Sequence, residues 1–316
     1  MHILPIPEIE AMPFTALDEA RPVALVTSRA AWEAVRGRLH LPIVWQVEVE
    51  EATQACWDTL VPSVQGEVVY AVGGGLAADA AKYIAVRCDL PLVCLPTALS
   101  VDAFLTWASG VRQDGCVRYL ETKAPDRLVI DYGVLAEAPP SIRAAGICDL
   151  LSIATGSWDW RFAEEQGKNP EGMEYVPYVD QVAAGILQGA LDCAEAAGRG
   201  DPAGLKQLLD CLALEVQLCN QIGHARPEEG SEHYFAYAVE NAMGAGLAHG
   251  DLVGPGILLM AERQGQDLSP LRHALESCRI PLETIPQAVI ESTLRSLPAY
   301  VRRHDLPYGI AHCLTW

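Results

Sequence analysis

The sequence is poor in basic residues. Its 316 residues include 22 Lys and Arg against 41 Asp and Glu, which gives a formal net charge of −19. A surface that binds nucleic acid needs clustered Lys and Arg, so we expect no nucleic-acid partner. The sequence also lacks an uninterrupted run of about 18 apolar residues, and we therefore expect no membrane span.

Targeting and disulfide signals are missing as well. The opening "MHILPIPEIEAMPF" has no basic segment followed by an unbroken apolar one, so it does not resemble a signal peptide. The ten cysteines include no C-x-x-C pair and mostly stand in apolar runs, which is typical of small buried side chains in a reducing compartment. These features predict a cytoplasmic protein.

What the sequence does contain is a large folded core. Half of its residues are apolar and 20% are charged, a balance that disfavours wholesale disorder. At roughly 100–200 residues per domain, the length predicts two domains or one large α/β unit.

The order of patterns favours two domains. Up to about residue 135, β-branched runs such as "PVALVTS", "GEVVYAVGG" and "RLVIDYG" alternate with helical patterns, which predicts a parallel sheet covered by helices. Beyond "EAPPSIRAAG", long segments carry apolar residues at helical spacing instead. Pro139 and Pro140 mark the connection, so we expect an α/β domain over residues 1–138 and a helical domain over residues 139–316.

Three consecutive glycines stand between a β-branched run and a helical pattern. Gly73, Gly74 and Gly75 follow the expected strand over residues 68–72, at the end of the strand where open α/β sheets bind ligands. Without Cβ atoms they let a phosphate approach the backbone, while the next helix directs its N–H groups at the anion. The alternative is a plain tight turn, and the spacing differs from the GxGxxG fingerprint of dinucleotide-binding domains.

The sequence blocks that follow the three glycines resemble those of a known superfamily. Asp79 and Lys82 follow on the same helix, and "LPTALSVDA", "KAPDRLVIDYGVLAEAPPSIRAAGICDLLS", "ARPEEGSEH" and "LAHGDLVG" come later. Together with "GGGLAADAAKYIA" these blocks resemble the dehydroquinate synthase-like superfamily, which includes glycerol dehydrogenase, the iron-containing alcohol dehydrogenases and glycerol-1-phosphate dehydrogenase. The resemblance implies an N-terminal Rossmann-like domain with a parallel sheet, which binds the dinucleotide. An all-α C-terminal domain for metal and substrate would follow it.

The resemblance also assigns roles to the glycine-turn region. The glycines would hold the cofactor pyrophosphate, and Asp102 would face the substrate hydroxyls. The further cofactor-binding candidates are Asp79, Thr97, Ser100 and Thr106. From the residues alone, Thr97 and Ser100 could instead cap a helix that starts at Ser100, with Asp102 in its first turn.

Three residues are candidate metal ligands: Asp149, His233 and His249. Singly, Asp149 could be a helix N-cap and each histidine a core or surface residue. On one straight helix the two histidines would lie roughly 24 Å apart, so a shared metal requires a break between them, and Asn241, Gly244 and Gly246 are suited to make it. In the resembled family an Asp and two His at these positions bind one divalent metal, zinc or iron, and leave open positions for substrate.

Details of the sequence favour one branch of that superfamily. Asp149, rather than Glu, favours a dehydrogenase over a dehydroquinate synthase-like lyase, and Ile153 stands where iron-type alcohol dehydrogenases commonly have His. "RPEEGSEH" and "SWDWRFA" are most similar to glycerol-1-phosphate dehydrogenase, which reduces dihydroxyacetone phosphate. Ala103, Phe104 and Trp107 depart from that group, and the chain ends at "CLTW", earlier than typical members.

The sequence allows more than one substrate and cofactor. No acidic residue directly follows the first expected strand, so the site can accept the 2′-phosphate of NADP as well as the ribose of NAD. Arg29 could pair with that 2′-phosphate, which favours NADPH. His224, Arg226 and Lys168 are candidate partners for a substrate phosphate, or else solvated loop residues. We expect a small-molecule substrate and a homo-oligomer. The alternatives are a polyol or alcohol dehydrogenase, a lyase of the same fold, and a binding protein with a degraded site.

Overall fold

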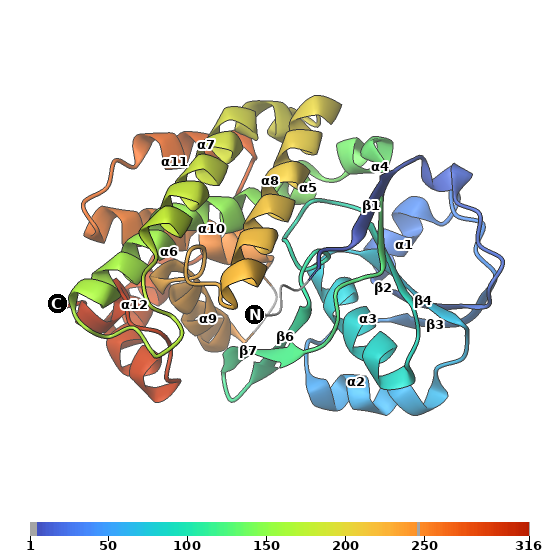
Figure 1. The fold of residues 1–316 in the computed structure, drawn as a ribbon, viewed down its shortest axis with the longest axis horizontal. Coiled ribbons are helices and arrows are strands. Elements are labelled where there is room, and N and C mark those ends of the chain that lie inside the picture. Colours follow the sequence, from blue (N-terminus) through green and yellow to red (C-terminus); the bar gives the residue numbers. More distant parts are fainter. Residues whose placement is uncertain (1–4, 245–246, 316) are drawn as a thin grey trace. The chain divides into compact units, whose positions relative to one another are not determined.

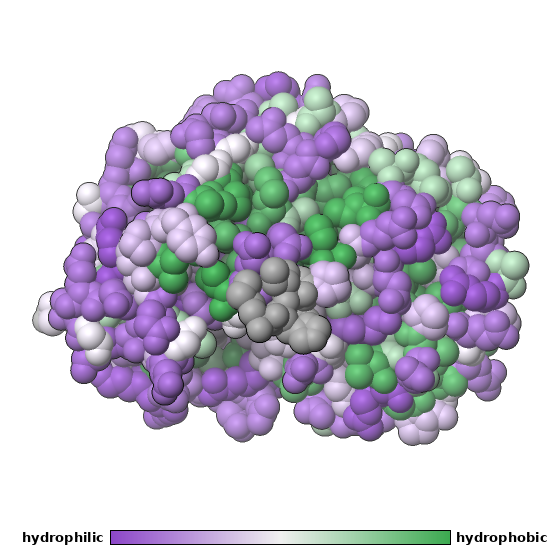
Figure 2. All heavy atoms as spheres, viewed as in Figure 1, coloured by the Kyte–Doolittle hydropathy of each residue, from purple (hydrophilic) through white to green (hydrophobic). Residues whose placement is uncertain are grey.

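The computed structural model describes residues 5–244 and 247–315. The chain divides into two compact units, of which one ends at Pro139 and the other begins at Pro140. Figure 1 shows the elements of both. Figure 2 shows hydrophilic residues over much of the visible face, as the charged composition predicts.

The first unit is built on a parallel sheet. Its strand order is β1-β8-β5-β4-β2-β3, and all neighbouring strands run in the same direction. The strands are β1 (Glu8–Ala11), β2 (Val23–Thr27), β3 (Ile43–Glu48), β4 (Val68–Gly73), β5 (Leu92–Pro96) and β8 (Arg127–Ile130). The helices are α1 (Arg29–Val35), α2 (Gln54–Leu60), α3 (Gly75–Cys88) and α4 (Tyr132–Glu137), with short 3-10 turns η1 (Phe14–Ala16) and η2 (Val61–Ser63). The expected α/β architecture is confirmed.

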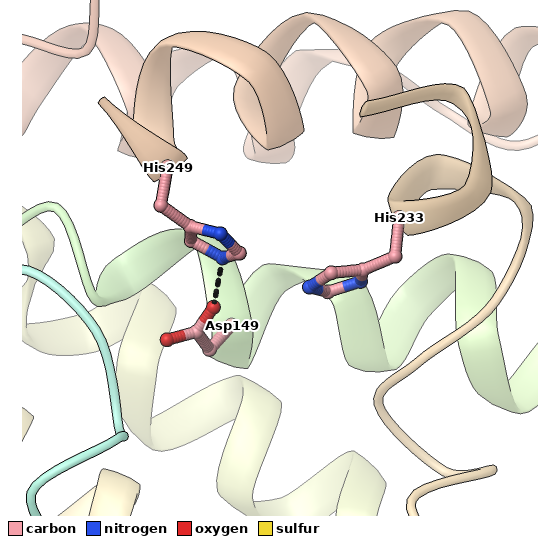
Figure 3. Close-up of side chains that lie close together, drawn as sticks. All are labelled: Asp149, His233 and His249. Atoms are coloured by element: carbon pink, nitrogen blue, oxygen red, sulfur yellow. Dashed lines mark hydrogen bonds and ion pairs between the residues drawn. The ribbon is translucent and has the colours of Figure 1, made fainter. Parts of the chain in front are cut away.

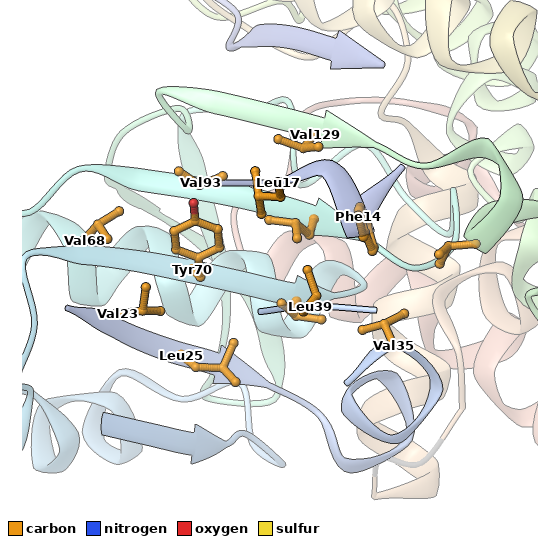
Figure 4. Close-up of a cluster of buried hydrophobic side chains, with 13 residues drawn as sticks. Phe14, Leu17, Val23, Leu25, Val35, Leu39, Val68, Tyr70, Val93 and Val129 are labelled. Atoms are coloured by element: carbon orange, nitrogen blue, oxygen red, sulfur yellow. The ribbon is translucent and has the colours of Figure 1, made fainter. Parts of the chain in front are cut away.

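Strand β4 lies at the centre of this unit's core. All six of its residues are buried. Its alternate residues Val68, Tyr70 and Val72 pack in one cluster with Leu25 of β2 and Phe14 of η1 (Figure 4). Because β4 is buried along its whole length, the glycine turn at its carboxyl end has a rigid support.

A two-stranded antiparallel hairpin completes the first unit. It joins β6 (Ala108–Gln113) and β7 (Cys116–Glu121) through Asp114 and Gly115, both with positive φ, at 54° and 76°. An Asp-Gly pair in this conformation is a preferred two-residue hairpin turn. This hairpin was not predicted from the sequence, although the Asp-Gly pair is a signal for it.

The second unit consists of helices over its described residues. They are α5 (Pro140–Arg143), α6 (Ile147–Glu165), α7 (Pro177–Arg199), α8 (Pro202–Ile222), α9 (Ser231–Met243), α10 (His249–Arg263), α11 (Ser269–Ser277) and α12 (Gln287–Arg303), followed by the 3-10 turn η3 (Ile310–Cys313). The expected helical second half is confirmed. Within residues 5–244 and 247–315, no helix is both long and apolar enough to cross a membrane.

The chain breaks its helix between the two candidate histidine ligands, as the spacing requires. Helix α9 ends at Met243, where Gly244 takes a left-handed conformation with φ of 77°, and α10 begins at His249. A positive φ favours glycine at this helix end. Asn241 lies inside α9, and Gly246 lies outside the described residues.

Candidate active site

The glycine turn leaves no space for side chains. A Cβ atom on Gly74 would lie 2.9 Å from the Ser100 hydroxyl oxygen, and one on Gly75 would lie 2.8 Å from a methyl group of Val101. Gly73 has a φ of 144°, and its carbonyl accepts a hydrogen bond from the Thr97 amide at 3.3 Å. The structure therefore places Thr97 and Ser100 beside the turn from which α3 starts.

No helix starts at Ser100. Residues 97–107 form an irregular segment with a turn in which the Leu105 amide bonds to the Asp102 carbonyl at 2.7 Å. The alternative of a capped helix there was wrong, because the chain enters strand β6 at Ala108 only a few residues later. The segment presents Asp102 half-buried.

A buried lysine holds this segment in place. Lys82 is completely buried, and its ammonium group donates to the carbonyl of Ala103 at 2.8 Å, to the Thr106 hydroxyl at 3.0 Å and to the carbonyl of Ala108. It also pairs with the Asp79 carboxylate at 2.9 Å. Asp79 and Thr106 are thus occupied by Lys82, and their contact with a cofactor stays a prediction.

Arg29 has a carboxylate partner that was not predicted from the sequence. Its Nε donates to Glu48 at 3.1 Å. Glu48 ends β3 and stands directly beside Thr27, the last residue of β2. Parallel strands end at the same edge of the sheet, so an acidic residue on the next strand can lie beside the end of β2. Glu48 does so, although no acidic residue directly follows β2 in the sequence.

Asp149, His233 and His249 converge in the second unit (Figure 3). Each offers one ligand atom, and these atoms all lie within 4.8 Å of one another. His249 begins α10, and its Nε2 lies 2.7 Å from the Asp149 carboxylate. The Asp149 side chain is 4% exposed and that of His249 31%. The cluster is therefore buried on one side and accessible on the other.

Asp149 lies inside a helix. Helix α6 begins at Ile147, and Asp149 belongs to its first turn, where a carboxylate is favourable near the positive end of the helix dipole. The alternative of Asp149 as a helix N-cap was wrong, because the helix starts two residues earlier and Gly146 is the cap.

His233 is oriented by its sequence neighbour. The buried carboxylate of Glu232 lies 2.9 Å from Nδ1 of His233 and also accepts the Gly230 amide at 2.7 Å. This contact leaves Nε2 of His233 for the space shared with Asp149 and His249. Burial lowers the pKa of His233, but the hydrogen bond and charge of Glu232 more than offset it, so that the pKa rises to about 9.

A buried carboxylate anchors the start of α9. Asp159 on α6 accepts the Ser231 amide at 2.8 Å and its hydroxyl, and also the Ile310 amide of η3 at 2.8 Å. Burial, aided by the charge of Glu232, raises the pKa of Asp159 to about 6 in spite of these donors. Asp159 therefore binds its proton more tightly in the folded chain than in the unfolded one.

This shift predicts a pH dependence of stability. Between the ordinary value of 3.8 and about 6, the folded state holds a proton that the unfolded state has lost, so the free energy of unfolding falls as pH rises. We expect Asp159 to contribute a loss of roughly 3 kcal/mol across this window. Denaturant unfolding at several pH values should show a steeper fall in the free energy of unfolding for the wild type than for Asp159→Asn. The control Asp305→Asn, at an exposed residue, should fall as steeply as the wild type. Equal slopes for wild type and Asp159→Asn would contradict it.

The three candidate phosphate partners lie in different settings. Arg226 is buried, His224 is half-buried close to it, and Lys168 is exposed just after α6 ends. The backbone amide of Arg226 donates to Nδ1 of His224 at 3.3 Å. The structure thus brings His224 and Arg226 together.

Comparison with known proteins gives a consistent result. The family profile described as iron-containing alcohol dehydrogenase matches residues 13–139. A glycerol-1-phosphate dehydrogenase [NAD(P)+] from Aeropyrum pernix is 31% identical over 255 residues, which are 80% of this chain and 70% of that protein. One from Methanothrix thermoacetophila is 30% identical over 235 residues, 73% of this chain. The match spans 65% of the length of that second relative.

Solved structures share the fold. A glycerol dehydrogenase from Schizosaccharomyces pombe aligns with a TM-score of 0.69 at 20% identity, over 99% of this chain and 86% of that one. A probable glycerol dehydrogenase from Sinorhizobium meliloti aligns with a TM-score of 0.66, also at 20% identity, over 94% and 87%. These two structures show a shared fold. The Aeropyrum pernix relative, 31% identical and matched over 70% of its length, shows that the chain belongs to the family of the glycerol-1-phosphate dehydrogenases.

Proposed function

We propose that this chain is a metal-dependent NAD(P)H oxidoreductase that reduces dihydroxyacetone phosphate, as a glycerol-1-phosphate dehydrogenase does. The observation that carries the proposal is the convergence of Asp149, His233 and His249 in a member of this family. One carboxylate and two imidazoles fit zinc or iron and leave coordination positions for a substrate oxygen.

Each part of the chain has a role in this proposal. Asp149 and the two imidazoles would hold the ion, and the backbone amides at the start of α3 would bind the cofactor pyrophosphate. A bound divalent metal supplies Lewis acidity at the substrate oxygen, and the nicotinamide supplies the hydride. Asp102, held on the segment that Lys82 fixes, would orient the substrate hydroxyls.

Location and assembly are part of the proposal. We place the enzyme in the cytoplasm, and its ten free cysteines, most of them buried, support a reducing compartment. We also propose a homo-oligomer, in line with the exposed apolar side chains of Tyr178, Val182 and Leu214. Light scattering on the purified protein measures the oligomer directly.

The test pairs metal analysis with turnover. We expect about one zinc or iron per chain and oxidation of NADH or NADPH with dihydroxyacetone phosphate. Turnover restricted to dihydroxyacetone or simple ketones would move the enzyme to the polyol or alcohol dehydrogenases. Absence of both metal and turnover would refute the proposal.

Glu48 is expected to set the balance between the two cofactors. Its carboxylate neutralises Arg29, and the charges of Glu50 and Glu33 act on the same guanidinium, which opposes a 2′-phosphate. Glu48→Gln should therefore raise the ratio of kcat/KM for NADPH to that for NADH by about tenfold. The matched control Glu10→Gln breaks the Glu10–Arg127 pair on the opposite edge strand and should leave the ratio unchanged. A ratio unaffected by Glu48→Gln would show that Arg29 and Glu48 do not face the adenosine ribose.

Glu232 is expected to matter for metal binding without being a ligand. Glu232→Gln keeps the size of the side chain but removes the charge that orients and polarises His233. We expect metal affinity to fall by about 10–100-fold, measured by competition with a chelator. Glu291→Gln is a matched control, because Glu291 is an exposed carboxylate of the same unit that pairs with Arg295. Equal affinities in wild type and Glu232→Gln would leave Glu232 a purely structural role.

A further inference from the structure

Arg226 is a buried cation without a carboxylate partner among the described residues. Arg226 is only 2% exposed, and one of its terminal nitrogens, Nη2, donates to the Tyr308 carbonyl at 2.8 Å. Its Nε and Nη1 have no hydrogen-bond partner in residues 5–244 and 247–315. Burying a charge in this way is strongly unfavourable unless something compensates it.

Two histidines stand near this guanidinium, both oriented as donors. The Arg226 amide donates to Nδ1 of His224, and the Gly309 amide donates to Nδ1 of His312, each at 3.3 Å. An Nδ1 that accepts a hydrogen bond leaves the proton of the neutral ring on Nε2. Both imidazoles therefore offer an N–H group.

Both rings lie where the neutral form of the imidazole is favoured. Burial, helped by the charge of Arg226 and opposed by that of Glu174, lowers the pKa of His224 to about 4. Burial lowers the pKa of His312 to about 4 as well, helped by Arg302 and Arg226. Both rings are neutral near pH 7 and both sense the charge of Arg226.

A hydroxyl group adds to the same set. Tyr234 is 1% exposed, and its hydroxyl has no hydrogen-bond partner among the described residues. The charge of Arg226 acts on it too. Nε and Nη1 of the guanidinium carry three N–H groups, each imidazole adds one N–H and Tyr234 adds one O–H, all of which can donate.

We propose that Arg226, His224 and His312 form a binding site for a phosphate group. A buried cation whose charge acts on two neutral imidazoles that can donate through Nε2 suits a tetrahedral oxyanion, whose oxygens each accept several bonds. The site is distinct from the metal cluster: it is built by the connection between α8 and α9 and by η3, whereas the metal ligands lie on α6, α9 and α10. The phosphate belongs either to the phosphorylated substrate, in which case this inference rests on the proposed function, or to free phosphate.

The first experiment titrates the full-length protein with inorganic phosphate. We expect saturable binding in calorimetry and, in proton NMR, a rise in the pKa of two histidine rings when phosphate is added. Arg226→Gln should weaken binding at least about tenfold. Because a buried substitution can impair folding, His312→Ala is the second variant, and His273→Ala, which removes an exposed ring paired with Glu195, is the matched control.

The second experiment separates the two sources of phosphate. If the substrate's phosphate binds here, His312→Ala raises KM for dihydroxyacetone phosphate and leaves KM for dihydroxyacetone unchanged. If the site takes free phosphate, both KM values stay the same while phosphate binding is lost. Phosphate binding that is absent, or equal in the wild type and both variants, would overturn the inference. A wild type that binds phosphate but reduces no ketone would instead refute the proposed function alone.

Discussion

His233→Ala is expected to leave a folded protein without bound metal and without reductase activity. The substitution removes one of three ligands and leaves two, Asp149 and His249, to hold the ion. Lewis-acid stabilisation is worth several kcal/mol, so kcat/KM should fall by about a thousandfold or more. Metal analysis and steady-state kinetics measure the two effects on one preparation.

The matched control for this variant is His273→Ala. His273 is an exposed histidine of the same unit, paired with Glu195 at 3.1 Å, so its removal should change neither metal content nor rate. His249→Ala should resemble His233→Ala, since His249 Nε2 contacts Asp149 directly. Full metal content and undiminished turnover in His233→Ala would remove this cluster from the reaction.

Lys82→Met should cause the largest loss of stability in the first unit. The substitution leaves the Asp79 carboxylate buried without its cation and removes a donor from the Ala103 and Ala108 carbonyls. Burial already raises the pKa of Asp79, and Lys82 counteracts that shift. Breaking a buried pair typically costs about 3–5 kcal/mol, which denaturant unfolding can detect.

A double variant distinguishes the ion pair from simple loss of packing. Asp79→Asn combined with Lys82→Met removes both charges, so part of the stability should return. A double variant as unstable as the sum of the two single ones would mean that the pair itself contributes nothing. Lys82→Met should also impair kcat/KM, because the segment with Asp102 loses its anchor.

Periodicity was enough to predict much of the fold. The buried run over β4 and the glycines after it were predicted from the sequence, because a fully buried parallel strand is nearly all apolar. Strand β1 was missed because its four residues, Glu8–Ala11, are mostly exposed and two are glutamates. The break between α9 and α10 was predicted on the condition of a shared metal, since one metal cannot bind two histidines 16 positions apart on a straight helix, and Gly244 was among the residues expected to make it.

The partners of the site residues were harder to predict. Glu48 stands 19 positions after Arg29, and only the register of β2 with β3 places it at the same edge. Lys82 was placed on the helix after the glycines, but its acceptors come from the segment over residues 103–108, which the sequence pattern does not bring near it. Glu232 was visible as the residue before His233, but adjacent residues on a helix rarely face each other, so its hydrogen bond to the ring could not be expected.

The placement of the three ligands on α6, α9 and α10 has a thermodynamic consequence. Asp149 and His233 are 84 positions apart, so an unfolded chain cannot gather the ligands, and metal affinity is linked to folding of the helical unit. At a free metal concentration 100 times Kd, this linkage adds about 2.7 kcal/mol to the stability of the folded state. A chelator should therefore lower the melting temperature of the helical unit, and the sheet unit, which supplies none of these ligands, should keep its own.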